Sequence, residues 1–223
     1  MYQLLSDHPD FIVISKSANV HFHSQDGTAG VIAQAEADLG CKLYPVHRLD
    51  TPTSGLLIVA KSPQAANVFT QMFTEHKVQK YYLAIACGKP KKKQGWIVGD
   101  MAKSRRSMYK LLRTTDNPAV TQFFSQNVAQ GMRVYLLKPL SGKTHQLRVA
   151  LASIGVPILG DKLYGNELSD RCYLHAYSLH FSYLNQAYVF QQPPSFGEQF
   201  VLPQCREFMS NQWQLPNDLP WPS

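Results

Sequence analysis

Short apolar runs recur along the chain, and they do not alternate with helices in the regular way of a parallel α/β sheet. Runs of about 4–8 apolar residues between polar turns predict buried or half-buried strands. Because few stretches have helical spacing, we predict an α+β fold rather than a doubly wound sheet. Strands are predicted over residues 11–15, 56–60, 78–87, 120–124, 133–138, 173–183 and 188–191.

Three stretches have the features of helices. Residues 29–39 follow Thr28 as a candidate cap and end at Gly40, which suits a left-handed C-terminal position. The pair Ser62-Pro63 is typical of a helix start and predicts a helix towards His76. Residues 145–154 carry apolar side chains at helical spacing, with His145 and Arg148 on a neighbouring face.

The chain has 223 residues, enough for one substantial domain. We predict a single domain over residues 1–223 with a core at about 8–202, followed by a proline-rich tail over 203–223 that is extended on the surface. No apolar run approaches the roughly 18 residues of a membrane span. The first ten residues lack the features of a secretory signal, so we expect a cytoplasmic protein with no membrane partner.

The formal net charge of +7 is concentrated in one segment. Between Lys80 and Arg113 there are ten cations and one anion. A run such as Lys91, Lys92 and Lys93 is often only a solvated loop. Aromatic residues lie among these cations, however, and aromatic rings stack on unpaired bases, which favours a nucleic-acid partner.

The cysteines and histidines, the residue types that most often bind metals such as zinc, are scattered along the sequence. The four cysteines, at positions 41, 87, 172 and 205, form no CxxC pair, and the eight histidines form no HExxH motif. His21 and His23 would share one face of a strand, but catalytic zinc normally needs three protein ligands. We therefore expect no metal.

The segment 44–61 sets His47, Arg48 and Asp50 in a polar loop directly before a strongly apolar strand. Such a position can hold a carboxylate at the edge of a core. Aspartate in a turn is also a common acceptor for backbone amides, and Thr53 is a typical turn residue. Pattern alone leaves both interpretations open.

Four stretches of the sequence resemble the RluA-type pseudouridine synthases. Residues 47–61 read HRLDTPTSGLLIVAK, similar to the family signature of HRLD, two variable residues, TSG, an apolar strand and AK. Residues 80–84 resemble the K-x-Y-x-A strand, and 174–176 resemble the late L-H-A strand. Residues 141–165 are similar to the G-R-T-H-Q-I-R helix and the following G-x-P-I-x-G-D-x-x-Y-G loop. The motifs occur in order along nearly the whole chain.

The resemblance implies a mixed, mostly antiparallel central sheet flanked by helices and loops around an active-site cleft. It implies isomerisation of specific uridines in structured tRNA or rRNA, with no cofactor and no metal. By carry-over, Asp50 is the catalytic carboxylate, Arg148 its ion-pair partner, and Tyr82 the aromatic residue against the target base. A carboxylate can attack an electron-poor centre and then leave, and a nearby guanidinium favours its charged form. Whether Asp50 attacks C1' or C6, or an elimination route operates, stays open.

A uridine inside folded RNA must be flipped out to reach such a pocket, so several residues are expected to hold the RNA. Arg48 could instead form a local ion pair, Tyr82 could be ordinary strand packing, and His47 could satisfy neighbouring carbonyls. The family's K-P-A-G segment reads Lys16-Ser17-Ala18-Asn19 here, and Asn19 can adopt the positive φ of the missing glycine. The predicted RNA-binding residues are His47, Arg48, Thr53, Lys80, Lys91, Lys92, Lys93, Arg105, Arg106, Lys143, His145 and Gln146.

The alternative function is a non-catalytic RNA-binding or RNA-folding protein that keeps the fold. The joint presence of Asp50, Tyr82 and Arg148 favours the enzyme, because an unneeded buried ion pair often costs stability. We expect a monomer with no obligate protein partner.

Overall fold

The computed structural model describes residues 1–105 and 107–222. The chain divides into two compact units, and each is built from two stretches of sequence. Unit 1 comprises Met1–Val78 and His175–Gln192, and unit 2 comprises Gln79–Leu174 and the segment from Pro193 onwards. The single catalytic domain inferred from the sequence stays a prediction. Within the described residues, no helix is both long and apolar enough to cross a membrane.

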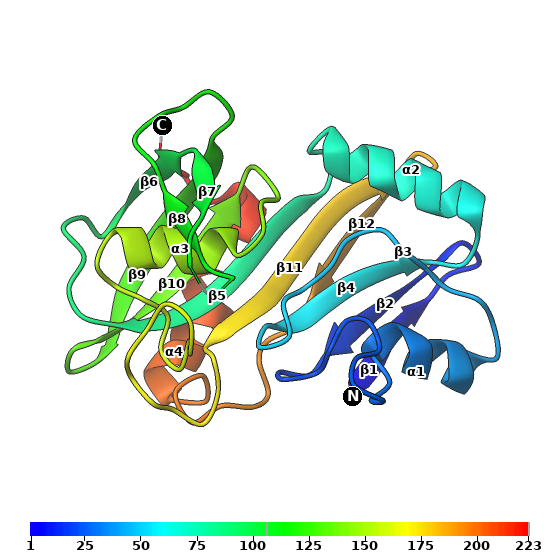
Figure 1. The fold of residues 1–223 in the computed structure, drawn as a ribbon, viewed down its shortest axis with the longest axis horizontal. Helices are drawn as coiled ribbons and strands as arrows, with labels where there is room; N and C mark the ends of the chain where they lie inside the picture. The colour runs from blue at the N-terminus through cyan, green and yellow to red at the C-terminus, as the bar shows by residue number, and fades with distance from the viewer. Residues whose placement is uncertain (106, 223) are drawn as a thin grey trace. The chain divides into compact units, whose positions relative to one another are not determined.

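Unit 1 is a mixed sheet with two helices (Figure 1). The strand order is β1-β2-β4-β11, with β3 paired to β4 and β12 paired to β11. β4 and β11 run parallel, and the other pairs are antiparallel. The elements are β1 (Tyr2–Asp7), β2 (Phe11–Lys16), α1 (Val31–Leu39), β3 (Tyr44–Pro45), β4 (Ser54–Ala60), α2 (Pro63–Thr74), β11 (Leu174–Tyr183) and β12 (Gln186–Gln191).

Local sequence explains these elements well. Every residue of β4 is buried, as its unbroken apolar run requires. The Ser62 side chain accepts a hydrogen bond from the Ala65 amide at 3.1 Å and caps α2, with Pro63 in the first turn. Gly40 ends α1 in the left-handed conformation, as predicted, but Thr28 does not cap its start. The N-cap residue is Gly30, which makes no side-chain capping bond. The position requires glycine, because a Cβ there would lie 2.3 Å from the His23 carbonyl carbon.

Unit 2 is an antiparallel sheet in the order β5-β10-β9-β6, with a separate β7–β8 hairpin. Figure 1 shows α3 lying over β9 and β10, and it also contacts β8. The α+β class and the mixed sheet are thus confirmed. The elements are β5 (Gln79–Cys87), β6 (Gln94–Gly99), β7 (Met101–Lys103), β8 (Tyr109–Leu111), β9 (Ala119–Ala129), β10 (Met132–Pro139) and α3 (Gln146–Ser153).

The C-terminal segment is not the extended tail predicted from its prolines. It forms α4 (Pro203–Glu207), a π-helical turn (Phe208–Gln212) and a short 3-10 helix (Pro216–Asp218). Its core-facing side chains, Cys205, Met209 and Trp213, are buried. The prediction was wrong because a proline in the first turn starts a helix rather than preventing one.

Two of the family-like motifs meet inside unit 1. Ser54 and Gly55 of the TSG motif pair in parallel with His175 and Ala176 of the LHA motif. The hydroxyl of Ser54 lies 2.7 Å from His175 Nδ1, and His175 Nε2 lies 2.7 Å from the Gln192 carbonyl. A carbonyl only accepts, so Nε2 donates to it. At Gly55 φ is 108°, and a Cβ would lie 2.2 Å from the Ala176 carbonyl oxygen.

Gly55→Ala should therefore destabilise the protein by about 3–5 kcal/mol, the sum of backbone strain and overpacking. Gly131→Ala is the matched control, because Gly131 also has positive φ (71°) but its Cβ would meet nothing within 4 Å. Gly131→Ala should lower the free energy of unfolding by only about 1–2 kcal/mol. Urea unfolding midpoints measure both, and equal losses would contradict the close approach of β4 and β11.

Candidate active site

Asp50 begins a tight turn immediately before β4 in unit 1. The Thr53 amide donates to the Asp50 carbonyl at 3.0 Å, which closes the turn over residues 50–53. Asp50 is half-buried, whereas Thr53 is only 2% exposed. The turn therefore places the half-buried Asp50 shortly before the fully buried β4.

A buried lysine fixes this turn. Lys16, at the end of β2, is 1% exposed. Its ammonium group donates to the carbonyls of Ser17 and Val20 at 2.9 Å each and to that of Thr51 at 3.1 Å. Charge-assisted bonds of this kind offset the cost of burying the charge. Asn19 has the predicted positive φ, 60°, within the segment that presents two of these carbonyls.

The other unit 1 residues predicted to bind RNA fall into different environments. His47 Nε2 accepts a hydrogen bond from the Ile58 amide at 2.9 Å, and its ring stacks on Phe73 with a centroid distance of 4.4 Å. It thus extends the short β3–β4 pairing and has a structural role. Thr53 is buried, as noted above, and Arg48 is exposed beside the Asp50 turn. Of these three, we retain only Arg48 in the proposed RNA-contacting set.

In unit 2, Lys80 and Tyr82 project from the same face of β5, because alternate residues of a strand share a face. Tyr82 is half-buried. Tyr81 points the opposite way, where its hydroxyl donates to Asn217 Oδ1 at 2.9 Å, and burial raises its pKa to about 12. Burial lowers the pKa of Lys80 below its usual 10.5. Lys80 therefore brings a poorly solvated charge to the face that carries Tyr82.

Arg148 on α3 forms a buried, two-pronged ion pair with Asp161. Arg148 Nε and Nη2 donate to the two carboxylate oxygens at 2.7 Å each, and the guanidinium carbon lies 5.1 Å from the centre of the Tyr164 ring. Asp161 Oδ1 also accepts from the Leu163 and Tyr164 amides at 3.0 and 3.3 Å. The pair thus fixes both the guanidinium and the following loop. The predicted pairing of Arg148 with Asp50 stays a prediction.

The segment before α3 is organised by the Gln146 amide. Its oxygen accepts from the Ser141 hydroxyl and the Lys143 amide, and its nitrogen donates to the Val120 carbonyl and the Thr121 hydroxyl, at 2.8–3.0 Å. These are all four of the hydrogen bonds that a side-chain amide can make, two accepted by the oxygen and two donated by the nitrogen. Gln146 therefore has a structural role, and we leave it out of the RNA-contacting set.

Two neighbours of Gln146 keep their polar groups near the surface. The Lys143 ammonium donates to Asn117 Oδ1 at 2.7 Å. The His145 Nδ1 atom lies 2.8 Å from the Tyr164 hydroxyl, which also accepts from the Tyr109 amide at 2.9 Å. Tyr164 thus joins the β7–β8 hairpin to the start of α3.

The remaining predicted RNA contacts belong to the basic segment. Lys91, Lys92 and Lys93 are exposed between β5 and β6, and Arg105 is exposed between β7 and β8. Arg106 lies outside the described residues.

Sequence reasoning missed Lys16 and Asp161. In the sequence, Lys16 belongs to a segment that departs from the family pattern, and Asp161 is one residue of a loop motif. The sequence shows only that Lys16 ends an apolar strand and that Asp161 follows Gly160. Neither feature reveals partners that lie elsewhere in the chain. Among the described residues, no three histidine, cysteine or acidic side chains are grouped as metal ligands would be.

Arg148→Met should cost about 3–5 kcal/mol of stability, because the Asp161 charge stays buried without its guanidinium. Adding Asp161→Asn keeps an oxygen for the loop amides and removes that charge, so the double variant should regain at least half of the loss. Urea unfolding of both single variants and the double variant measures the coupling. Strictly additive losses would contradict the buried-charge explanation.

Lys80 gives a pH-dependent prediction. Because its folded pKa is lowered, the folded protein binds fewer protons than the unfolded chain between that pKa and 10.5, and stability rises with pH in this window. The free energy of unfolding of the native protein should therefore increase relative to Lys80→Met as pH rises from 7 towards 10.5. Taking the difference between the two free energies of unfolding cancels the contributions of the other titrating groups. A difference that stays flat or falls would contradict the desolvation of Lys80.

Comparison with known proteins identifies the family. The model of the RNA pseudouridylate synthase family matches residues 10–153. A Haemophilus influenzae protein named an uncharacterized RNA pseudouridine synthase is 47% identical over 204 residues, or 90% of this chain and 91% of that protein. The dual-specificity RNA pseudouridine synthase RluA of Salmonella typhimurium is 34% identical over 68% of this chain and 73% of its own length.

The fold agrees with this result. The structure of the human protein RNA pseudouridylate synthase domain containing 1 matches with a TM-score of 0.75 and 25% identity, covering 88% of this chain and 84% of that one. The sequence resemblance to pseudouridine synthases is confirmed. This chain belongs to the RNA pseudouridylate synthase family, a family of RNA isomerases.

Proposed function

We propose that this protein converts specific uridines of structured RNA, of the tRNA or rRNA class, into pseudouridine, with Asp50 as the catalytic carboxylate. The observation that carries the proposal is the Asp50 turn. A half-buried carboxylate occupies the aspartate position of the HRLD motif, and the Lys16 ammonium holds the adjacent Thr51 carbonyl at 3.1 Å. A group held in one position is what a positioned nucleophile requires.

The reaction rearranges bonds within one nucleotide. The bond from uracil N1 to the sugar C1' breaks, a bond from C5 to C1' forms, the C5 proton leaves, and N1 gains a proton. The balance needs neither an oxidant nor a co-substrate. The protein must therefore supply a group that attacks and departs, a means of moving one proton, and a water-poor pocket.

Each of these tasks has a candidate among the described residues. Asp50 attacks the sugar at C1' or the base at C6 and later leaves. Tyr82, half-buried on β5, lies against the base and assists proton movement. Arg148 is the proposed ion-pair partner of the Asp50 carboxylate, a role that suits a guanidinium. The ion pair with Asp161 supports this role, because it holds the guanidinium in a single orientation.

The substrate uridine must leave its stack to be reached, at a cost of a few kcal/mol. We propose that Arg48, exposed beside the Asp50 turn, contacts the RNA where the uridine has left. The phosphates are held by cations of unit 2. We further propose that the protein works as a monomer in the cytoplasm. The proposed phosphate contacts are Lys80, Lys91, Lys92, Lys93, Arg105, Arg106 and Lys143, with His145 beside them.

The release of tritium from RNA labelled at uridine C5 tests the reaction directly. The native protein should release tritium into water, and Asp50→Asn should reduce the rate by at least about 10³-fold, because an amide does not act as the nucleophile. RNA binding by Asp50→Asn, measured by filter retention, should stay within about threefold of the native value.

Asp38→Asn is a matched control, because it removes a carboxylate on α1 that accepts hydrogen bonds from Tyr2 and Gln34. It should release tritium at the native rate. Equal release by the native protein and Asp50→Asn would remove Asp50 from the mechanism. RNA binding without release by the native protein would favour the non-catalytic alternative.

A further inference from the structure

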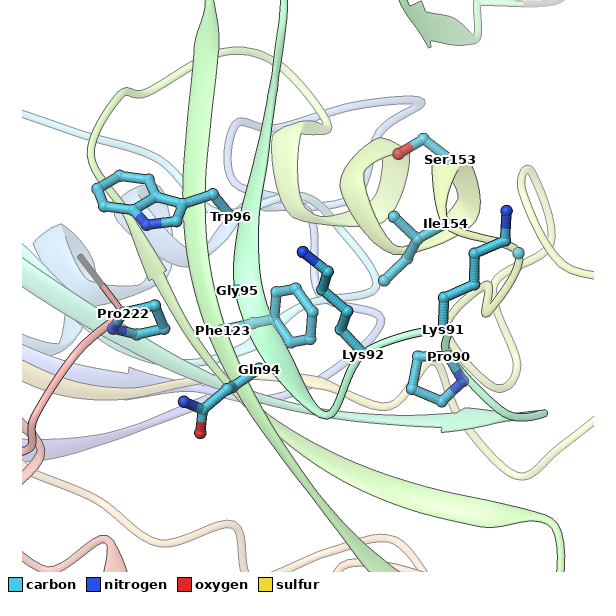
Figure 2. A pocket seen from close by; sticks show the side chains of 11 residues that line it. Pro90, Lys91, Lys92, Gln94, Gly95, Trp96, Phe123, Ser153, Ile154 and Pro222 are labelled. Carbon is cyan, nitrogen blue, oxygen red and sulfur yellow. The ribbon is translucent and has the colours of Figure 1, made fainter.

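A second candidate site lies in unit 2. A pocket of about 830 Å³ opens around the start of β6 and the end of α3 (Figure 2). This volume is within the roughly 300–1,000 Å³ of typical ligand sites. Its lining contains none of the proposed catalytic residues. The lining residues are Pro90, Lys91, Lys92, Gln94, Gly95, Trp96, Phe123, Ser153, Ile154, Gly155 and Pro222.

The strand register explains the shape of this pocket. In the β6–β9 pair, Trp96 lies opposite Gln122 and Gly95 lies opposite Phe123, and directly paired residues share a face of the sheet. Trp96 and Phe123 are therefore on opposite faces, and in Figure 2 they flank the β6 strand. β6 ends the strand order, so the pocket can continue over its edge from one face to the other. A short, flexible chain fits this shape better than a rigid compact ligand.

The apolar surfaces suit nucleobases. Trp96 is 42% exposed although it is a large aromatic residue on a strand. On the other side of β6, the half-buried Ile154 side chain lines the pocket together with the Phe123 ring, which is only 3% exposed, so Ile154 provides most of the second apolar contact (Figure 2). The Gln122 side chain donates to the Pro222 carbonyl at 2.7 Å and so holds Pro222 on the Trp96 side. An exposed aromatic ring such as that of Trp96 can stack on bases of any sequence.

The rim of the pocket is cationic. Lys91 and Lys92 line it, and no acidic residue is among the lining residues that the structure describes. The backbone beside them is fixed, because the Lys93 carbonyl accepts bonds from the Ser125 amide at 2.7 Å and the Ser125 hydroxyl at 2.8 Å. These bonds fix the end of the β5–β6 connection, directly after Lys92, on the sheet. This arrangement complements phosphates on either side of stacked bases.

We propose that this pocket binds a short unpaired segment of the substrate RNA, with one base on Trp96, a neighbouring base against Ile154, and phosphates at Lys91 and Lys92. The proposal rests on the proposed function, because that function makes RNA the partner. The pocket would anchor a single-stranded region of the folded RNA apart from the flipped uridine, and so contribute to the choice of substrate.

Binding of a hexauridylate strand to the full-length protein tests the proposal. Quenching of tryptophan fluorescence reports the binding, and Trp96→Phe identifies the part of the signal that comes from Trp96. Trp96→Ala should weaken binding about tenfold, whereas Trp96→Phe should stay within about threefold because it keeps a stacking ring. Ser153→Trp places a bulky ring in the pocket from an exposed position and should also weaken binding about tenfold.

Val98→Ala is the matched control, since Val98 is on the same strand and equally exposed at 42% but does not line the pocket. It should bind like the native protein. For variants without a reliable fluorescence signal, a dye-labelled strand gives the same affinity by anisotropy. Circular dichroism and unfolding midpoints show whether each variant is folded.

Three results would overturn the proposal. The first is unchanged hexauridylate binding by both Trp96→Ala and Ser153→Trp. The second is equal affinity for the same strand in a duplex with hexaadenylate, since stacking requires unpaired bases. The third is equal affinity for polyphosphate or polyglutamate, which would make the pocket a general anion or acidic-peptide surface.

The proposed function fails in a different way. If hexauridylate binds with the predicted losses but the native protein releases no tritium from labelled RNA, the pocket is supported and the isomerase activity is not. If tritium is released but the pocket variants bind normally, the activity stands and the pocket proposal is wrong. Where both hold, Trp96→Ala should raise the KM for folded RNA about tenfold, and Val98→Ala should leave it unchanged.

Discussion

The hydrogen bond from the buried Lys16 ammonium to the Thr51 carbonyl holds the turn on which the proposed chemistry depends. A lysine that is 1% exposed would be costly without partners, and the carbonyls of Ser17, Val20 and Thr51 supply them. Thr51 directly follows Asp50, so the same bonds that stabilise the charge also fix the backbone beside the proposed nucleophile. The turn is thus in place before RNA binds, and no binding energy is used to order it.

Unit 2 also contains a buried charge that is stabilised by its partners, but there the partner is a second, opposite charge. Arg148 and Asp161 neutralise each other in a two-pronged pair, and the loop amides occupy the remaining capacity of the carboxylate. The exposed side chains of Lys91, Lys92 and Lys93 are not held in this way, because the hydrogen bonds of this segment fix only the backbone at Lys93. Fixed charges suit a reaction centre, whereas flexible ammonium groups suit phosphates whose positions vary between RNA molecules.

The elements that could be predicted are those whose signals are local. The apolar run of β4, the Ser62-Pro63 start of α2 and the positive φ of Asn19 depend on neighbouring residues alone. The prolines of the C-terminal segment were misleading. Pro203 starts a helix whose stability comes from burying Cys205 and later residues, and that packing cannot be inferred from the segment itself.

The site was predictable only in part for the same reason. The family motifs point to Asp50, Tyr82 and Arg148, and the roles proposed for them rest on that resemblance. Lys16 and Asp161 act through partners that the fold brings to them, so no spacing rule points to them. The pocket beside Trp96 combines two strands, one helix and the C-terminal segment, and only the structure brings these together.

Site-resolved mapping of pseudouridine in cellular RNA tests the central role of Asp50 most directly. Pseudouridine and uridine have the same mass, so chemical labelling must distinguish them. Cells without the gene should lose the modification at one or more sites, the native gene should restore it, and an Asp50→Asn gene expressed at the same level should not. Restoration by Asp50→Asn would contradict the account.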